Sequence, residues 1–297
     1  FGKMHSRGLI VAMCAVAAEA FSPSSFMGLR TSSVPAAVSK GNVVGGGAGL
    51  SGLRMQDLDK GNDLTAVGRR NLEDLEGKWS KVGVLGGSKG VGKEIVKLLS
   101  GMGVEVKALV RSEEAKKELD AMPGVSAMIG DALEATDVCS ALNGCDAAIS
   151  TLGGNQETQK VDYTGNMNMI ENAGIIGVTR MILVTSVGTG DSKEALPDSA
   201  YTAMESFLTQ KTKAENLLLK YYTNTDYTII RPGGLKSEPA TGKAILTEDK
   251  KAAGSVTRED VADLCIQALY SKSASQKVLT CVDPSQSDKD APEAFSL

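Results

Sequence analysis

The stretch Lys81-Val82-Gly83-Val84-Leu85-Gly86-Gly87-Ser88-Lys89-Gly90-Val91-Gly92 decides how this sequence is interpreted. Its first part is mostly apolar and β-branched, which is typical of a short buried strand. The residues after the last glycine, Lys93–Leu99, have the spacing of an amphipathic helix. A strand, a glycine-rich turn and a helix in this order favour a loop that binds nucleotide phosphates. The alternative is an ordinary glycine-rich turn between a strand and a helix.

Three glycines of this stretch have separate physical roles in the nucleotide interpretation. Gly86 permits a tight turn off the strand, and Gly90 lets a pyrophosphate approach the backbone. Gly92 lets the helix pack close to the strand. The predicted phosphate-binding loop consists of Gly86, Ser88, Lys89, Gly90, Val91 and Gly92.

Composition excludes several classes of enzyme. The chain has 297 residues, and its single histidine is His5. The body of the chain therefore has no histidine for acid–base catalysis or for a Ser-His-Asp triad. The five cysteines form no Cys-x-x-Cys pair. We therefore expect no metal site and no disulfide scaffold.

The first 55 residues have the composition of a targeting sequence. Leu9–Ala18 is too short to span a bilayer but suits a signal-peptide core, and Ala18-Glu19-Ala20 gives a small-x-small cleavage site before Phe21. From Phe21 to residue 54 the chain has no acidic residue. A transit peptide that begins with Phe after a signal peptide resembles the two-part presequence of algae with secondary plastids. This favours the plastid stroma; a plain secretory signal or a disordered tail are the alternatives.

Charge and hydropathy limit the partners of the body. The whole chain has a net charge of −4, and residues 1–55 carry +4, so the remainder is acidic at −8. An acidic body argues against nucleic acid as the main partner. No stretch is long and apolar enough to predict a transmembrane segment.

The body alternates strand and helix signals. Strands are predicted at 82–85, 104–110, 125–129, 147–150, 181–185, 227–230 and 277–282. Helices are predicted at 93–100, 113–119, 165–173, 207–221 and 258–270. This rhythm predicts an α/β, doubly wound fold with a parallel sheet over residues 79–283. Residues 56–78 are expected to be a linker or extension, and 284–297 a disordered tail.

Several blocks together resemble an atypical short-chain dehydrogenase/reductase of the NmrA-like, NAD(P)-binding family. They are Gly86–Gly92, Leu109–Arg111, Gly130-Asp131, Val161–Asn166, Leu183–Ser186, Lys211 with Ala214-Glu215, Tyr227–Leu235 and Arg258–Ala262. The glycine spacing departs from many atypical members, which would have a glycine at Lys89. The resemblance implies a Rossmann domain with a small C-terminal substrate region at about 233–256.

The end of the second predicted strand favours NADP(H) over NAD(H). NAD-binding enzymes usually have an acidic residue there to hold the ribose hydroxyls, whereas this chain has Arg111. An arginine fork matches a 2′-phosphate, and Lys89 would add positive charge. The alternative is that Arg111 is merely a solvated residue. By position in the family, the other cofactor contacts are Asp131, Ala132, Ser150, Thr151, Leu152, Gly153, Lys211 and Pro232.

The catalytic pattern of the family is incomplete. Its standard reductases use a Tyr-x-x-x-Lys pair, in which the lysine lowers the pKa of the phenol. Lys211 matches the lysine and Ser186 the serine, but Phe207 stands at the tyrosine position. Tyr201 could substitute if the segment 188–200 is a loop that folds over the site.

Two functions follow from this pattern. The first is an NADPH-dependent reductase of a small organic acceptor, in which the cofactor does the demanding chemistry. The second is a non-catalytic NADP-binding module, such as a plastid assembly factor, scaffold or redox sensor with a photosynthetic or thylakoid-surface protein as partner.

Overall fold

The computed structural model describes residues 79–155, 157–222, 225–287 and 291–297. The predicted presequence at 1–55 and the predicted extension at 56–78 lie outside these residues.

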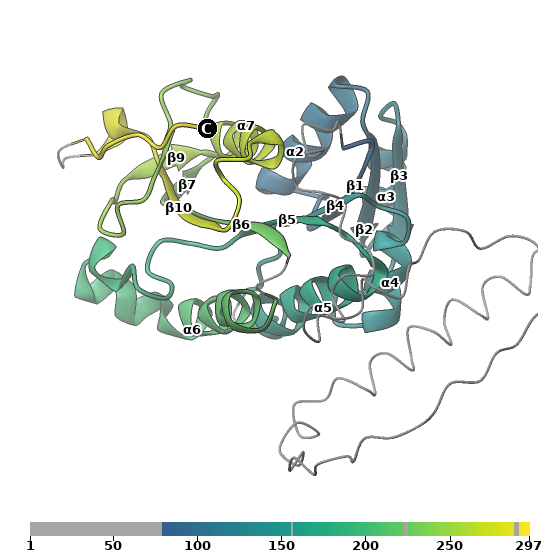
Figure 1. Cartoon of the computed structure of the whole chain (residues 1–297), viewed down its shortest axis with the longest axis horizontal. Coiled ribbons are helices and arrows are strands. Elements are labelled where there is room, and N and C mark those ends of the chain that lie inside the picture. Colours follow the sequence, from purple (N-terminus) through teal and green to yellow (C-terminus); the bar gives the residue numbers. More distant parts are fainter. Residues whose placement is uncertain (1–78, 156, 223–224, 288–290) are drawn as a thin grey trace, which may run out of the picture.

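The centre of the molecule is one large sheet (Figure 1). Its strands are β1 (Lys81–Leu85), β2 (Glu105–Val110), β3 (Val125–Ile129), β4 (Ala147–Ser150), β5 (Arg180–Val184), β6 (Asp226–Pro232), β8 (Ile245–Thr247) and β10 (Lys277–Val282). They lie in the order β3-β2-β1-β4-β5-β6-β10-β8. All neighbours are parallel except β8, which runs antiparallel to β10. The predicted doubly wound Rossmann fold is confirmed.

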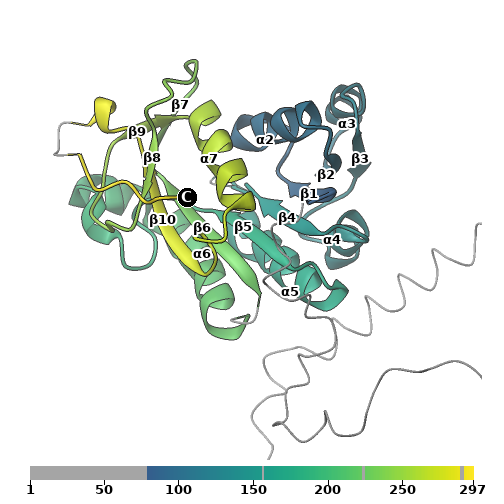
Figure 2. The same cartoon turned by 45° about the horizontal axis from the view of Figure 1, so that its top comes forward.

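Helices cover both faces of the sheet (Figures 1 and 2). They are α2 (Gly90–Gly101), α3 (Glu113–Asp120), α4 (Ala135–Leu142), α5 (Asn166–Ile176), α6 (Asp198–Tyr221) and α7 (Arg258–Tyr270). Helices α2, α3 and α7 pack on one face, and α4, α5 and α6 pack on the other. Each layer encloses its own apolar cluster, so the sheet is buried on both sides.

Local sequence explains these elements. Every residue of β5 is buried, as expected for a central strand between two helical layers. In α2 the buried side chains Val91, Ile95 and Leu99 recur every four residues, which places them on one face of the helix. Ser112 and Thr257 begin α3 and α7, and their hydroxyl groups accept hydrogen bonds from backbone N–H groups in the first turn.

The region that we predicted to bind substrate contains short strands. In addition to β8, it includes β7 (Gly234–Lys236), which pairs in parallel with β9 (Ser255–Thr257). The order of the large sheet reverses between β1 and β4. In doubly wound sheets ligands bind outside the carboxyl ends of the strands at this switch point.

Two segments differ from the sequence prediction. Helix α6 begins at Asp198, whereas the sequence predicted a start at residue 207. The first two turns are mostly exposed and lack an apolar stripe, so the sequence pattern did not reveal them. Residues 284–297 were expected to be disordered, but the part that is described contains the 3-10 helix η7 (Pro284–Gln286). In the same segment, the N–H of Phe295 donates to the carbonyl of Leu246 at 2.7 Å.

No helix in the described part of the chain has the length and hydropathy needed to cross a bilayer.

Candidate functional site

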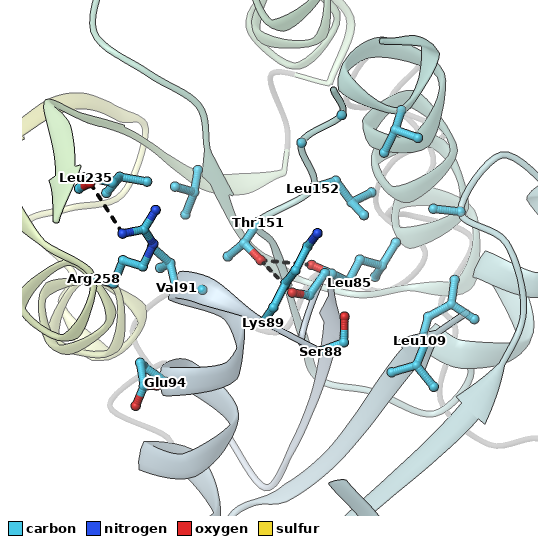
Figure 3. Close-up of a pocket in the computed structure, with 18 of the residues that line it drawn as sticks. Leu85, Ser88, Lys89, Val91, Glu94, Leu109, Thr151, Leu152, Leu235 and Arg258 are labelled. Carbon is cyan, nitrogen blue, oxygen red and sulfur yellow. Dashed lines mark hydrogen bonds between the residues drawn. The ribbon is translucent and has the colours of Figure 1, made fainter. Parts of the chain in front are cut away.

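A pocket of about 850 Å³ lies at the carboxyl ends of β1 and β4 (Figure 3). Its walls come from the loops after the first five strands, from α6 and from the amino-terminal ends of α2 and α7. Most of the predicted site residues line this pocket. They are Gly86, Ser88, Lys89, Gly90, Val91, Arg111, Asp131, Ala132, Thr151, Leu152, Gly153, Ser186 and Lys211.

The glycine loop has the geometry that its sequence predicts. Gly86 has a φ of +86° and Gly90 a φ of +58°, both in the region that favours glycine. A Cβ at Gly92 would lie 2.3 Å from the carbonyl oxygen of Gly86, so only glycine permits this approach of α2 to the loop. Gly92 therefore allows α2 to pack closely against the glycine loop, and it does not itself line the pocket.

The start of α2 is suited to an anion. Lys89 precedes the helix, provides no capping hydrogen bond from its side chain, and the first turn contains no acidic residue. By contrast, α3 and α7 have both a capping hydroxyl and acidic residues in their first turns. The first N–H groups of α2 have no partner within the helix, and the helix dipole favours a negative charge there. This arrangement fits a phosphate group.

Positive charge lines the pocket beside β2. Arg111 is the first residue after β2, and its exposed side chain lines the pocket together with that of Lys89. Asp131 lies nearby, but its Oδ1 accepts a hydrogen bond from the N–H of Leu133 at 3.0 Å within its own turn. The end of β2 therefore presents a guanidinium where NAD-binding enzymes usually present a carboxylate.

Lys211 of α6 lines the pocket and forms an ion pair with the buried Asp162. The Nζ of Lys211 lies 2.8 Å from Oδ1 of Asp162 and donates to the carbonyl of Leu152 at 3.2 Å. The other oxygen of Asp162 accepts from the N–H of Gly154 at 3.0 Å. Asp162 thus fixes both the lysine and the loop after β4, so the ammonium group has one defined position.

Asp162 belongs to an unusual element. It lies in the π-helix η5 (Val161–Gly165), directly before α5. π-helical turns are rare in proteins, and those that occur are often found at functional sites. Sequence analysis recognised Val161–Asn166 as a family block but assigned no role to Asp162. The presence of an acidic residue in this family block is the sequence signal that could have identified Asp162 as a site residue.

A second buried pair lies behind the pocket wall at the end of β5. Thr185 lines the pocket and donates to Oε1 of Glu215 at 2.6 Å. Glu215 in turn pairs with Arg231 at 2.7 Å, and both side chains are buried. Arg231 also pairs with Asp191 at 2.7 Å. Burial alone would raise the pKa of Asp191, but hydrogen bonds from Arg231 and Lys250 lower this pKa to about 2.

Four predicted residues do not line the pocket: Gly92, Ser150, Tyr201 and Pro232. Ser150 is buried and donates to Oδ1 of Asn166 at 2.5 Å, which ties β4 to α5. Tyr201 lies in the first turn of α6 and not in a loop, and its ring centroid is 4.4 Å from Nζ of Lys193. Of the segment 188–200 that we considered as a loop over the site, residues 188–197 are turns and the short 3-10 helix η6 (Lys193–Ala195), and 198–200 belong to α6; this segment does not bring Tyr201 into the pocket lining.

Further lining residues were not predicted. They include Glu94, Thr158, Val161, Thr185, Leu235, Ser237, Glu238, Arg258 and Glu259. Arg258 and Glu259 belong to a block that the family resemblance had already marked, and polar residues at the start of a helix are a usable signal. Val161, Thr185 and Leu235 likewise lie in blocks that the resemblance had marked, without a role being assigned to them, whereas Glu94, Thr158, Ser237 and Glu238 lie in none of these blocks.

Metal ligands do not gather in the described part of the chain. There, no group of three or more His, Cys, Asp and Glu side chains could hold a metal ion. The polar groups of the pocket are backbone N–H groups, hydroxyls, lysines and arginines, together with the carboxylates of Glu94, Asp131, Glu238 and Glu259. These groups fit a phosphate-containing organic cofactor.

Comparison with known proteins agrees with this geometry. A family model described as NAD(P)H-binding matches residues 86–272. The chain belongs to this NAD(P)H-binding family. The match covers the glycine loop, the Asp162–Lys211 pair and the whole of α7. The resemblance predicted from the sequence blocks is thereby confirmed.

Three similar proteins illustrate the range of the family. An uncharacterized chloroplastic protein of Arabidopsis thaliana is 32% identical over 71% of this chain and 80% of its own length. Sanguinarine reductase of Eschscholzia californica is 28% identical over 58% of this chain and 77% of its own length. The solved structure of ChuY, an anaerobillin reductase of Escherichia coli O157:H7, superposes with a TM-score of 0.64 at 33% identity. That match covers 70% of this chain and 100% of the bacterial chain.

Proposed function

We propose that this protein is an NADPH-dependent oxidoreductase that reduces a small organic acceptor. One observation carries the proposal: a single pocket joins the glycine loop at the start of α2 to the Lys211–Asp162 pair. The pocket has the size of a cofactor site, since small-molecule sites typically occupy about 300–1,000 Å³. Two similar proteins, sanguinarine reductase and anaerobillin reductase, are named as reductases and support this class of activity.

Charge at the end of β2 supports NADP(H) over NAD(H). Arg111 and Lys89 both line the pocket, and both residues are exposed. A guanidinium can bind a 2′-phosphate through two parallel hydrogen bonds. An unphosphorylated ribose would leave this positive charge without a partner.

The residues of the chain would divide the work along the pocket. When bound, NADPH supplies a hydride, and the protein supplies binding and orientation. The N–H groups at the start of α2 would hold the diphosphate, and Lys211 would hold the nicotinamide ribose. Phe207 lies one helical turn before Lys211 and has no proton to give. We therefore propose a conjugated acceptor whose reduced form takes its proton from water.

Turnover of NADPH tests the proposal. The purified protein would be mixed with NADPH and a panel of quinone, flavin and enone acceptors, and NADPH consumption followed by the loss of its fluorescence. We expect at least one acceptor class to be reduced with saturation kinetics, and NADH to be a poorer donor. Tight NADPH binding with no turnover on any class would contradict the reductase and favour the non-catalytic module with a protein partner.

We also propose a plastid location. The leader composition and the chloroplastic Arabidopsis relative support it. If the presequence has two parts, as in algae with secondary plastids, the mature protein begins after residue 50 and an intermediate begins at Phe21. N-terminal sequencing of the protein from its source tests this. Retention of Leu9–Ala18 in the mature form would contradict the location.

A further inference from the structure

Arg258 lines the pocket next to the glycine loop. It is the first residue of α7, and α7 packs against α2 on the same face of the sheet. A Cβ built at Gly90 would lie 3.7 Å from Nε of Arg258. Figure 3 shows the guanidinium beside Val91, at the start of α2. The positive group is thus placed directly above the loop that is suited to phosphate.

The guanidinium is only partly used by the protein. Nη1 donates to Oγ of Ser237 at 2.7 Å and to the carbonyl of Leu235 at 3.3 Å. Within the described residues, no carboxylate forms an ion pair with Arg258. Glu259, its neighbour, is directed to the N–H of Ala240 instead. Because a guanidinium has five N–H donors in a fixed plane, the Nε and Nη2 side remains for an acceptor in the pocket.

Two groups face the space beside the glycine loop, and together they indicate which anion would bind there. On one side are the first N–H groups of α2, which have no capping side chain and no acidic neighbour in the first turn. On the other side is Arg258. A diphosphate has enough oxygen atoms to accept hydrogen bonds from the backbone N–H groups and from Arg258 at the same time.

We propose that Arg258 binds the diphosphate of the cofactor and at the same time holds β7 and Ser237, so that cofactor binding orders the substrate segment. This inference rests on the proposed NADPH site. Ser237 and Leu235 lie in the region that lines the pocket opposite the glycine loop. With the diphosphate bound, Arg258 would be held on both sides, and residues 235–237 would be fixed against the pocket. The cofactor therefore binds before the acceptor.

Binding of two probes to the full protein tests the first half of the proposal. NADPH contains the diphosphate, whereas adenosine 2′-phosphate carries only the phosphate that Arg111 would bind. Arg258→Gln should weaken NADPH about ten- to a hundredfold, since a charged hydrogen bond contributes about 1.5–3 kcal/mol, and should leave adenosine 2′-phosphate unchanged. The matched change Arg111→Gln should weaken both probes. Unchanged NADPH affinity in folded Arg258→Gln would overturn the proposal.

Amide hydrogen exchange tests the second half. Saturating NADPH should protect residues 235–237 in the wild type. Ser237→Ala, a change at an exposed side chain, should reduce this protection when both proteins are saturated with NADPH, so the test does not depend on whether Arg258→Gln folds. Equal protection in both proteins, or none in the wild type, would overturn the coupling. Failure of the wild type to bind NADPH at all would instead refute the proposed function.

Discussion

Replacing Gly90 with alanine tests the phosphate loop without disturbing the core. Gly90 has a φ of +58°, and a Cβ there would contact only the Arg258 side chain, at 3.7 Å and 3.9 Å. Alanine therefore has room but must adopt the left-handed conformation, which costs about 1–2 kcal/mol. For a domain of this size we expect the melting temperature to fall by roughly 2–8 °C. The methyl group would also project toward the place where a phosphate must approach the backbone.

Gly177→Ala is the matched control. Gly177 follows α5, has a φ of +83°, and has nothing within 4 Å of its ideal Cβ. It therefore imposes the same kind of backbone strain far from the phosphate loop. Thermal unfolding and calorimetric titration with NADPH would be measured for both variants. We expect similar losses of stability, with NADPH affinity lowered at least tenfold only in Gly90→Ala.

Two results would refute this reasoning. Wild-type affinity in Gly90→Ala would mean that the cofactor does not approach the backbone at this loop. An equal loss of affinity in Gly177→Ala would mean that strain alone, and not the position of the methyl group, weakens binding.

Three further predictions concern the other groups of the site. Lys211→Ala should weaken NADPH binding and slow hydride transfer together, which titration and single-turnover kinetics would measure; an unchanged affinity in a folded variant would show that Lys211 does not face the cofactor. Phe207→Tyr should create a Tyr-x-x-x-Lys pair on one helical face and add carbonyl reduction, as assayed with simple ketones. If the variant reduces no ketone, the placement of Lys211 beside the nicotinamide ribose is contradicted. Because the pKa of Asp191 is lowered to about 2 when folded, below roughly 3.9 when unfolded, its stabilising contribution is present above about pH 4 and lost as pH falls toward 2. Asp191 is half exposed, so Asp191→Asn should cost under about 1 kcal/mol at neutral pH, and a difference in urea unfolding that persists below pH 2 would contradict this assignment.

Much of the fold could be predicted because its signals are local. Most of the seven predicted strands are short, largely apolar runs, and α2 and α7 show clear helical spacing, so these local patterns alone indicate burial. The start of α6 was missed because residues 198–206 are mostly exposed and carry no apolar stripe. Strands β7, β8 and β9 have three residues each, too few for a periodic pattern.

The site residues likewise fall into those that local sequence patterns predict and those that depend on tertiary contacts. The glycine loop and Arg111 were found because each follows a strand that can be recognised, and chain position then fixes spatial position. The Asp162–Lys211 contact and the approach of Arg258 to Gly90 join residues distant in sequence, and no local pattern encodes them. The π-helix around Asp162 has no characteristic spacing of apolar residues that would reveal it.

Calorimetric titration with NADPH and NADH, repeated on Arg111→Asp, tests the central claim most directly. One charged, two-pronged contact to the 2′-phosphate contributes about 1.5–3 kcal/mol, or roughly one to two powers of ten in affinity. We expect the wild type to bind NADPH at least tenfold more tightly than NADH, and Arg111→Asp to lose this preference. Equal affinities in the wild type, or an unchanged preference in Arg111→Asp, would contradict the assignment of this pocket as an NADPH site.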